Sequence, residues 1–423
     1  MPRQSHLFIA AEIDAAEIAP VKALLGTMTV AQDGQADPEN ALVPFGHIAG
    51  LHFARFVVLE DPSLRDRIGI TRLAPMEATR LALIVDGDGR PEELIDRLVV
   101  AAAEGLARIF RHCDPMLAAG QMGAWLRRHR LASAAVYVNA PGRGARQVRE
   151  EADLHEALLA ARLAHPHKSP HELWPDLHAA GRMVPLTPIE RPGVLDRLRH
   201  VGDLLSLPVL AILLGPFFLL AAPFLIAALR RRETRDPVIA PRPSRDRNRM
   251  LSAIEDHDLV NQYSAIGTVK PGRFRLWLTI VILWIIDWGA RHLYRHGRLG
   301  RVNTIHFASW TFLDDRRRIF FASNYDGSRE AYNDDFINKV AFGLNLSFSN
   351  GLGYPHTDWL ITGGARHEQD FKRYLFHHQI PTQVWYNAAR GLTTYDMARN
   401  ARLRRAFEKA PVGADLLRFV AEI

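Results

Sequence analysis

The sequence repeats itself in three places, and this internal repeat constrains the fold more than any other feature. Three pairs of segments match in the same order along the 423 residues: LHFARF at 51–56 with IHFASW at 305–310, ALIVDGDG at 82–89 with FFASNYDG at 320–327, and VYVNA at 136–140 with VWYNA at 384–388. Matches in one order indicate a duplicated structural unit. We therefore expect two copies of one fold, and the segment between them must be explained separately.

Each copy has the hydrophobic pattern of a small α+β unit. The first copy predicts strands at 6–12, 51–59, 81–85 and 134–139, with helices at 15–28 and 91–109. The second copy predicts strands at 262–267, 304–313, 318–323 and 383–387, with helices from 274 and from 328, and a last helix at 394–407. The order βαββαβ is typical of a ferredoxin-like fold.

We predict an α+β protein in which two ferredoxin-like repeats pair face to face as a pseudo-dimeric α/β barrel. The rival arrangement is two independent ferredoxin-like domains on a string. The expected divisions are a first repeat at 1–165, a linker at 166–250, and a second repeat at 251–423 with an apolar helix at 274–294. An open sheet face as apolar as these needs cover, which favours the paired arrangement.

The linker contains an apolar segment long enough for a membrane. Residues 204–229 carry no charge and are followed by Arg230, Arg231 and Arg232, and a basic, proline-rich stretch comes next. A bilayer needs about 20 apolar residues. A single crossing would leave the two repeats on opposite sides, so we hypothesise a re-entrant or monotopic hairpin bent at 215–216. The alternative is a true single span, with the repeats pairing between molecules of a homo-oligomer.

Charge and composition favour a lipid partner. The net charge of +7 comes from arginines that gather beside the apolar segments, which suits anionic lipid head groups and leaves no nucleic-acid partner expected. Arg230, Arg231 and Arg232 indicate the cytoplasmic face of a bacterial inner membrane. The second apolar segment, 276–286, is too short to cross and predicts either an interfacial helix or a buried core helix. Cys113 is a single cysteine, and the N-terminus predicts no signal peptide.

Residues at equivalent places in the two copies are candidates for a ligand site. His52 and His306 match, and each is either a structural strand histidine or part of a pocket. Asn324 and Asp326 lie at a strand-to-helix junction, where backbone amides attract anions and where an acidic side chain also caps a helix. His377 matches His129 when the VYVNA and VWYNA segments are superposed.

The copies differ most at 350–367, which in the second copy is a loop rich in glycine, aromatic residues and histidine. Long loops on a rigid scaffold often carry function. We predict His356 and His367 as haem ligands, and the remaining candidate ligand-binding residues are Arg366, Tyr386 and Arg390. The sequence has no Gly-x-Ser-x-Gly elbow, no phosphate-binding loop and no His-Glu-x-x-His motif.

Several phrases resemble a poorly characterised bacterial family with the same duplicated units around an apolar middle: IHFA at 305–308, SNYDGS at 323–328 and VKPG at 269–272. More distantly, the arrangement is similar to the dimeric α/β barrel superfamily, which includes dye-decolourising peroxidases and chlorite dismutases. That resemblance implies a haem cofactor and an α/β barrel. The peroxidases carry a Gly-x-x-Asp-Gly motif, and neither Asp-Gly turn here has its leading glycine.

Two functions follow as hypotheses, and the sequence leaves open whether the chain is an enzyme. The first is a membrane-associated, haem-dependent, peroxidase-like oxidoreductase. The second is a non-catalytic protein of the membrane surface that holds an apolar ligand or a protein partner. Membrane attachment is common to both.

Overall fold

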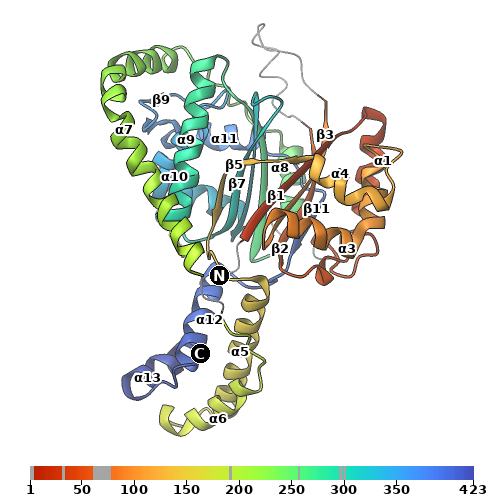
Figure 1. Cartoon of the computed structure of the whole chain (residues 1–423), viewed down its shortest axis with the longest axis vertical. Helices are drawn as coiled ribbons and strands as arrows, with labels where there is room; N and C mark the ends of the chain where they lie inside the picture. Colours follow the sequence, from red (N-terminus) through yellow and green to blue (C-terminus); the bar gives the residue numbers. More distant parts are fainter. Residues whose placement is uncertain are drawn as a thin grey trace.

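Two open antiparallel β-sheets and their covering helices form the body of the protein in a computed structural model (Figure 1). The structure describes residues 4–30, 34–60, 78–189, 193–255, 258–294, 299 and 302–423. The first sheet contains, in spatial order, β11 (Val384–Asn387), β2 (Leu51–Leu59), β3 (Arg80–Asp88), β1 (Gln4–Glu12) and β4 (Arg130–Leu131). The second sheet contains β5 (Ser133–Val138), β7 (Ile305–Leu313), β8 (Arg318–Asp326) and β6 (Val260–Thr268).

The helices form two outer layers and a separate lobe. The first sheet is covered by α1 (Ala15–Gly26), α3 (Pro91–Phe110) and α4 (Met122–Arg128). The second sheet is flanked by α9 (Arg273–His292), α10 (Arg329–Phe348) and α11 (Glu368–His378). The lobe at the bottom of Figure 1 contains α5 (Ala145–Ala164), α6 (Pro170–Arg182), α12 (Thr394–Phe407) and α13 (Gly413–Glu422). The remaining elements are α7 (Val194–Glu233), α8 (Arg245–Glu255) and a two-stranded β9 (Thr357–Asp358) and β10 (Thr362–Gly363).

The two sheets pack against each other because their strands are apolar on both faces. In β1, Leu7 and Ile9 point into the core under α1 and α3, while Phe8 and Ala10 point into the core shared with the second sheet. Phe8 meets Phe320 edge to face, with ring centroids 5.3 Å apart. Successive strand residues face opposite sides, so a strand buried on both faces reads as a continuous apolar run. The result is four layers: helices, sheet, sheet and helices.

Each half of the chain supplies the edge strand of the other half's sheet. β5, from the first half, pairs with β7, and β11, from the second half, pairs with β2. The two connections enter equivalent places: the amide of Asn139 donates to His306 O at 3.0 Å, and the amide of Ala388 donates to His52 O at 2.9 Å. This exchange joins the two halves through backbone hydrogen bonds as well as through side-chain packing.

Corresponding elements of the two halves share the same details. β2 and β3 pair with an irregularity between Leu51 and Phe53, and β7 and β8 pair with one between Ile305 and Phe307. Both α3 and α10 contain one non-helical residue, Ala102 and Val340, at the same distance from the helix start. The first two segments of the sequence repeat therefore lie in strands with the same pairing irregularity.

The third segment of the repeat is displaced by one residue from the match seen in the sequence. Tyr137 lies opposite Ala308, and Tyr386 lies opposite Ala54, so the two tyrosines correspond. A shift of one residue would turn each side chain to the other face of its sheet. The same displacement makes His378, rather than His377, the counterpart of His129: each has Nδ1 within 2.9 Å of the carbonyl oxygen four residues earlier.

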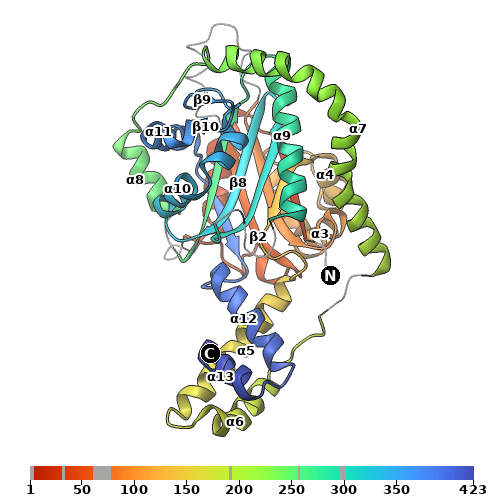
Figure 2. The ribbon, with the colours of Figure 1, turned by 90° about the vertical axis from the view of Figure 1, so that its left-hand side faces the viewer.

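The α+β class and the antiparallel sheets agree with the prediction, but within the described residues no sheet closes into a barrel. α9 is both a core helix and a surface helix, because Leu283 is buried while Trp277 and Ile285 are exposed. The expected hairpin in the apolar segment is wrong. α7 continues as one helix of 40 residues through Pro208, Pro216 and Pro223 and arches around α9 (Figure 2).

Candidate functional site

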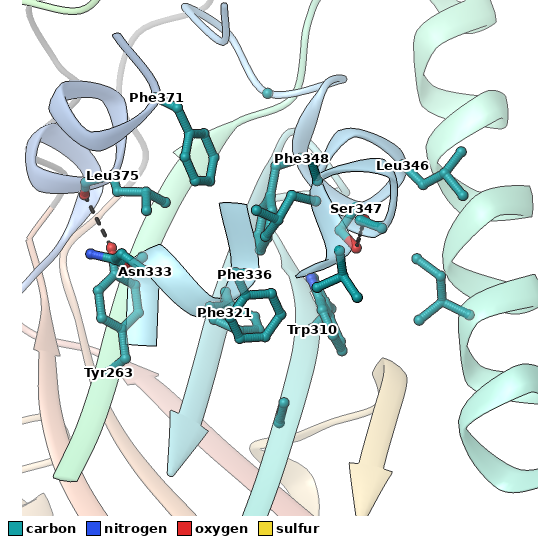
Figure 3. A pocket seen from close by; sticks show the side chains of 18 of the residues that line it. Tyr263, Trp310, Phe321, Asn333, Phe336, Leu346, Ser347, Phe348, Phe371 and Leu375 are labelled. Atoms are coloured by element: carbon teal, nitrogen blue, oxygen red, sulfur yellow. Dashed lines mark hydrogen bonds between the residues drawn. The ribbon is translucent and has the colours of Figure 1, made fainter. Parts of the chain in front are cut away.

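A pocket of about 500 Å³ runs beneath α10, over the outer face of the second sheet. Its walls are mainly apolar and come from β5 to β8 and from α9, α10 and α11. Figure 3 shows Tyr263 on the side of α11, Trp310 on the side of α9, and Phe321 and Phe336 between them. A mainly apolar pocket of this size with a few polar groups is the usual form of a small-molecule site.

Three residues of the pocket walls each carry a buried polar atom that has no hydrogen-bond partner among the described residues. The atoms are Tyr137 Oη, Trp310 Nε1 and Asn350 Nδ2, and these three side chains are 1%, 6% and 3% exposed. Burial also raises the pKa of the Tyr137 hydroxyl above its ordinary value, so this group is a neutral donor. Leaving such donors unsatisfied costs about 1–3 kcal/mol each, which makes them suited to a ligand that accepts hydrogen bonds.

The pocket adjoins an extensive exposed apolar surface formed by α7 and α9. Ile286 and Ala290 of α9 line the pocket, whereas Trp277, Val281 and Ile285 on the same helix are exposed. α7 runs beside α9 (Figure 2) and exposes many large apolar side chains. These include Leu205, Val209, Ile212, Leu213, Phe217, Phe218, Leu219, Leu220 and Phe224. An apolar surface of this extent is typical of a protein or membrane contact.

Both ends of α7 are held on the protein body. Near its start, Asp203 O accepts a hydrogen bond from Trp288 Nε1 at 3.1 Å, and its carboxylate pairs with Arg291 and His292 of α9. At its end, the buried Glu233 accepts hydrogen bonds from Thr357 Oγ1 and from the amides of 359 and 360. The apolar part of the helix therefore lies between two fixed points.

A buried polar cluster joins the end of α7 to the start of α9. Lys270 Nζ lies 2.8 Å from Asp236 Oδ2 and donates to Ser349 O at 2.7 Å. Arg275 pairs with the same aspartate and donates to Asn350 Oδ1 at 3.0 Å. Burial is the main cause that lowers the pKa of Lys270 to about 8. The cluster binds Asn350 through its side-chain oxygen, while its amide nitrogen has no partner among the described residues.

His306 and Asp326, two of the predicted site residues, form a helix-fixing pair outside this pocket. His306 Nε2 lies 2.6 Å from Asp326 Oδ1, and Asp326 Oδ2 accepts from the amide of Thr394 at the start of α12. The first half repeats this arrangement: His52 Nε2 lies 2.9 Å from Asp88 Oδ1, and Asp88 Oδ2 accepts from the amide of Ala145 at the start of α5. Its presence in both halves supports the structural interpretation.

Asn324 lies in a buried polar cluster between the two sheets. Its Oδ1 accepts from Arg55 Nη2 at 2.5 Å and from Trp385 Nε1 at 3.0 Å, and its Nδ2 donates to Asp86 Oδ2 at 3.2 Å. Asp86 also pairs with His6 at 2.7 Å. Because these groups satisfy one another across the interface, they fix how the sheets pack.

The other predicted residues are spread over three places. Arg366 is exposed and lies on the pocket wall, and the partly buried His377 ring meets the ring of His378. Tyr386 belongs to the core of the first half, where it stacks on Phe45 with ring centroids 5.1 Å apart. Arg390 donates to Ala36 O at 2.8 Å.

The predicted haem ligands do not fit a haem in this pocket. His356 and His367 are exposed and lie outside its walls, and His356 Nδ1 is 3.2 Å from Glu233 O. The described part of the chain contains no group of three histidine, cysteine or acidic side chains that could hold a metal. Haem binding stays a prediction, which an absorbance spectrum of detergent-purified protein tests.

Sequence reasoning missed Tyr137, Trp310 and Asn350. Each lies in or beside an apolar stretch, and such residues are more often core than site. The signal that could have found them is a difference in length: 24 residues separate α1 from β2, whereas 12 separate α9 from β7.

The comparisons with known proteins add no family. No protein family profile matches the chain, and neither a curated protein nor a solved structure is significantly similar to it.

Proposed function

We propose that this protein attaches to one face of a membrane through α7 and binds an apolar ligand in the pocket beneath α10. The observation that carries the proposal is the exposed apolar surface of α7 and α9, which lies directly beside an apolar pocket. Exposed apolar area costs about 25 cal/mol per Å² in water, so a surface this large is stable only when lipid or protein covers it.

Lipid is the cover that the chemistry of α7 favours. It is the one helix in the described residues that is long and apolar enough to cross a membrane. Residues 204–229 are uncharged, and Arg230, Arg231 and Arg232 follow, as is usual where a hydrophobic segment meets anionic head groups. The same arginines favour the cytoplasmic face of a bacterial inner membrane.

Attachment to a single face follows from the two fixed points of α7. A spanning helix separates its ends by the thickness of the bilayer, about 30 Å, with one end on each side. Here Asp203 and Glu233 both contact the same protein body. We therefore propose that α7 lies in one leaflet, as a monotopic anchor.

We further propose that the two halves are ferredoxin-like units that arose by duplication and kept a paired arrangement. The shared irregularity in β2–β3 and β7–β8 and the matching non-helical residues of α3 and α10 support it. In this proposal the ligand site belongs to the second unit only, the one that also carries the lipid-facing helix.

Liposome flotation tests attachment. We expect the full chain to float with anionic liposomes, and the double variant Ile212→Asp, Leu219→Asp to stay at the bottom of the gradient. The matched control is Val100→Asp, Met116→Asp, because both residues are at least as exposed but lie on the opposite half. Equal flotation of the two double variants would contradict the role of α7.

Cysteine labelling tests the single face. With Cys113→Ser as background, Asp196→Cys and Arg235→Cys place one exposed thiol before and one after the apolar segment. An impermeant maleimide should label both from the same side of sealed vesicles. Labelling of each from a different side would show that α7 spans the membrane.

A further inference from the structure

The pocket of the second half lies where the first half is filled by its own chain. In the first half, residues 34–50 pack under α3: Val43, Phe45 and Ile48 are buried in that core, and Phe45 stacks on Tyr386. The backbone of Leu42 approaches α3 so closely that a Cβ on Gly105 would lie 1.7 Å from Leu42 O. The glycine is therefore required for this segment to fit.

The corresponding positions of the second half lack this cover among the described residues. Tyr137 is the counterpart of Tyr386, and Gly343 is the counterpart of Gly105 by its position in the helix. A Cβ on Gly343 would meet nothing closer than Val340, at 4.0 Å. Both residues line the pocket. The second half therefore has an open space at this place. The connection that fills the equivalent space in the first half has 24 residues, and the corresponding connection of the second half has 12.

The polar atoms of the pocket indicate the chemistry of its occupant. Tyr137 and Trp310 lie on neighbouring strands, on the same face and two residues apart in register. Their Oη and Nε1 atoms are buried donors with no partner in the described part of the chain. A carbonyl oxygen, with two lone pairs, accepts two such hydrogen bonds.

Charge argues for a neutral occupant. The cationic side chains on the pocket wall, Lys339 and Arg366, are both exposed and stand at its rim. A carboxylate placed beside Tyr137 would be buried without a paired cation, which is costly. A neutral ester or ketone carries no such cost.

We propose that the pocket holds a single-chain neutral lipid whose carbonyl oxygen is bound by Tyr137 Oη and Trp310 Nε1. Its hydrocarbon chain lies against Gly343 and the aromatic side chains beneath α10, and it reaches the pocket from the bilayer beside α9. This inference depends on the proposed function, because it names the ligand class of the same site.

Equilibrium binding tests the inference with the full chain in detergent. The probes are radiolabelled methyl palmitate, hexadecane and palmitate, and the Gly343→Leu variant, whose side chain would occupy part of the pocket beneath α10, measures background. One or two buried hydrogen bonds correspond to a preference for the ester over the alkane of about tenfold or more. Tyr137→Phe and Trp310→Phe should each lose about tenfold in ester affinity and leave hexadecane binding nearly unchanged.

The matched control is Tyr386→Phe, the same substitution at the counterpart position, which should change neither affinity. Tyr137→Phe keeps the ring and removes one oxygen, so unaltered thermal unfolding shows that the variant folds. Equal affinities for ester and alkane would overturn the inference and leave the proposed function standing. Tighter binding of palmitate would overturn the neutral class. Binding of all probes at the Gly343→Leu background would reject the proposed function itself.

Discussion

The two halves of this protein share one framework and differ in what lies beneath their second helix. The first half is filled at this place by residues 34–50, with Phe45 stacked on Tyr386. The second half has a pocket at the same place, beside Tyr137. Because the sheet registers and the helix irregularities agree, the difference comes from the connection between the first helix and the second strand of each half. The half with the shorter connection is the half with the pocket.

The difference extends to the exposed apolar surface. α1, the first helix of the first half, is short and covers its own core, whereas α9 is long and carries apolar side chains on both its faces. The half with the pocket is therefore also the half that contacts α7. The first half is stabilised by a connection that fills its core, whereas the second half has a pocket and an exposed apolar surface.

The largest effect is expected from removing the side chain of Phe45, which fills the core of the first half beneath α3. Phe45→Ala deletes a ring that is 1% exposed and should lower the free energy of unfolding by about 3–5 kcal/mol. The cavity lies beside Tyr386, so the variant should bind an apolar probe at two sites instead of one. Denaturant unfolding and binding stoichiometry measure both effects. Met116→Ala, at an exposed position, is the control; an unchanged stoichiometry would break the comparison.

The paired glycines should respond in opposite directions. Gly105→Ala forces a methyl group onto the Leu42 backbone and should destabilise the protein by about 3 kcal/mol. Gly343→Ala enters open space and removes a helical glycine, so it should stabilise by up to about 1 kcal/mol. Thermal unfolding of the two variants decides the matter. A loss of stability in both would mean that the second pocket is closed in solution.

By register, the counterpart of Lys270 in the first half is the exposed Asp14, whereas Lys270 itself is buried and makes the stability of the protein depend on pH. Its pKa falls from 10.5 to about 8 on folding, so between these values the unfolded chain binds more protons. The free energy of unfolding should rise with pH across this window, by no more than about 3 kcal/mol. Lys270→Met should remove the rise, and Lys409→Met, at an exposed position, should keep it. Unfolding at pH 8 and pH 10 in urea measures the slope.

The smallest effect concerns a feature that the halves share. Asp88→Asn and Asp326→Asn each weaken the acceptor that fixes the start of α5 or α12, and each should cost about 1 kcal/mol. Similar losses in thermal unfolding would confirm that the two pairs play one role. A larger loss of ligand binding with Asp326→Asn alone would instead give His306 and Asp326 a part in the site.

The sequence predicted the elements well because each carries its own hydrophobic period. The ranges of β2, β7, α3 and α12 follow directly from their patterns and from their repeated order. The same reasoning misplaced the third repeat by one residue, because it compared residue identities, whereas the hydrogen-bond register of the strands determines which residues correspond. Tyr137 aligns with Tyr386 only when the strands opposite them are known.

The pocket could not be predicted from the sequence, for a related reason. Trp310 and Tyr137 are typical core residues. They line a pocket because no described residue of the second half fills the space that Phe45 fills in the first half. The composition of the loop at 350–367 predicted a functional site. In the structure, His356 and Thr357 of this loop contact Glu233 at the end of α7. His356 contacts the backbone of Glu233, and Thr357 binds the Glu233 carboxylate.

The exchange of edge strands has a consequence for biosynthesis. β2 can pair with β3 early in synthesis, but its other neighbour, β11, is available only when residues 384–387 have left the ribosome. Until then the nascent first sheet keeps an unpaired edge, while α7 has already emerged and can insert into lipid. Synthesis at the membrane surface would keep this waiting edge close to its late partner and away from other chains.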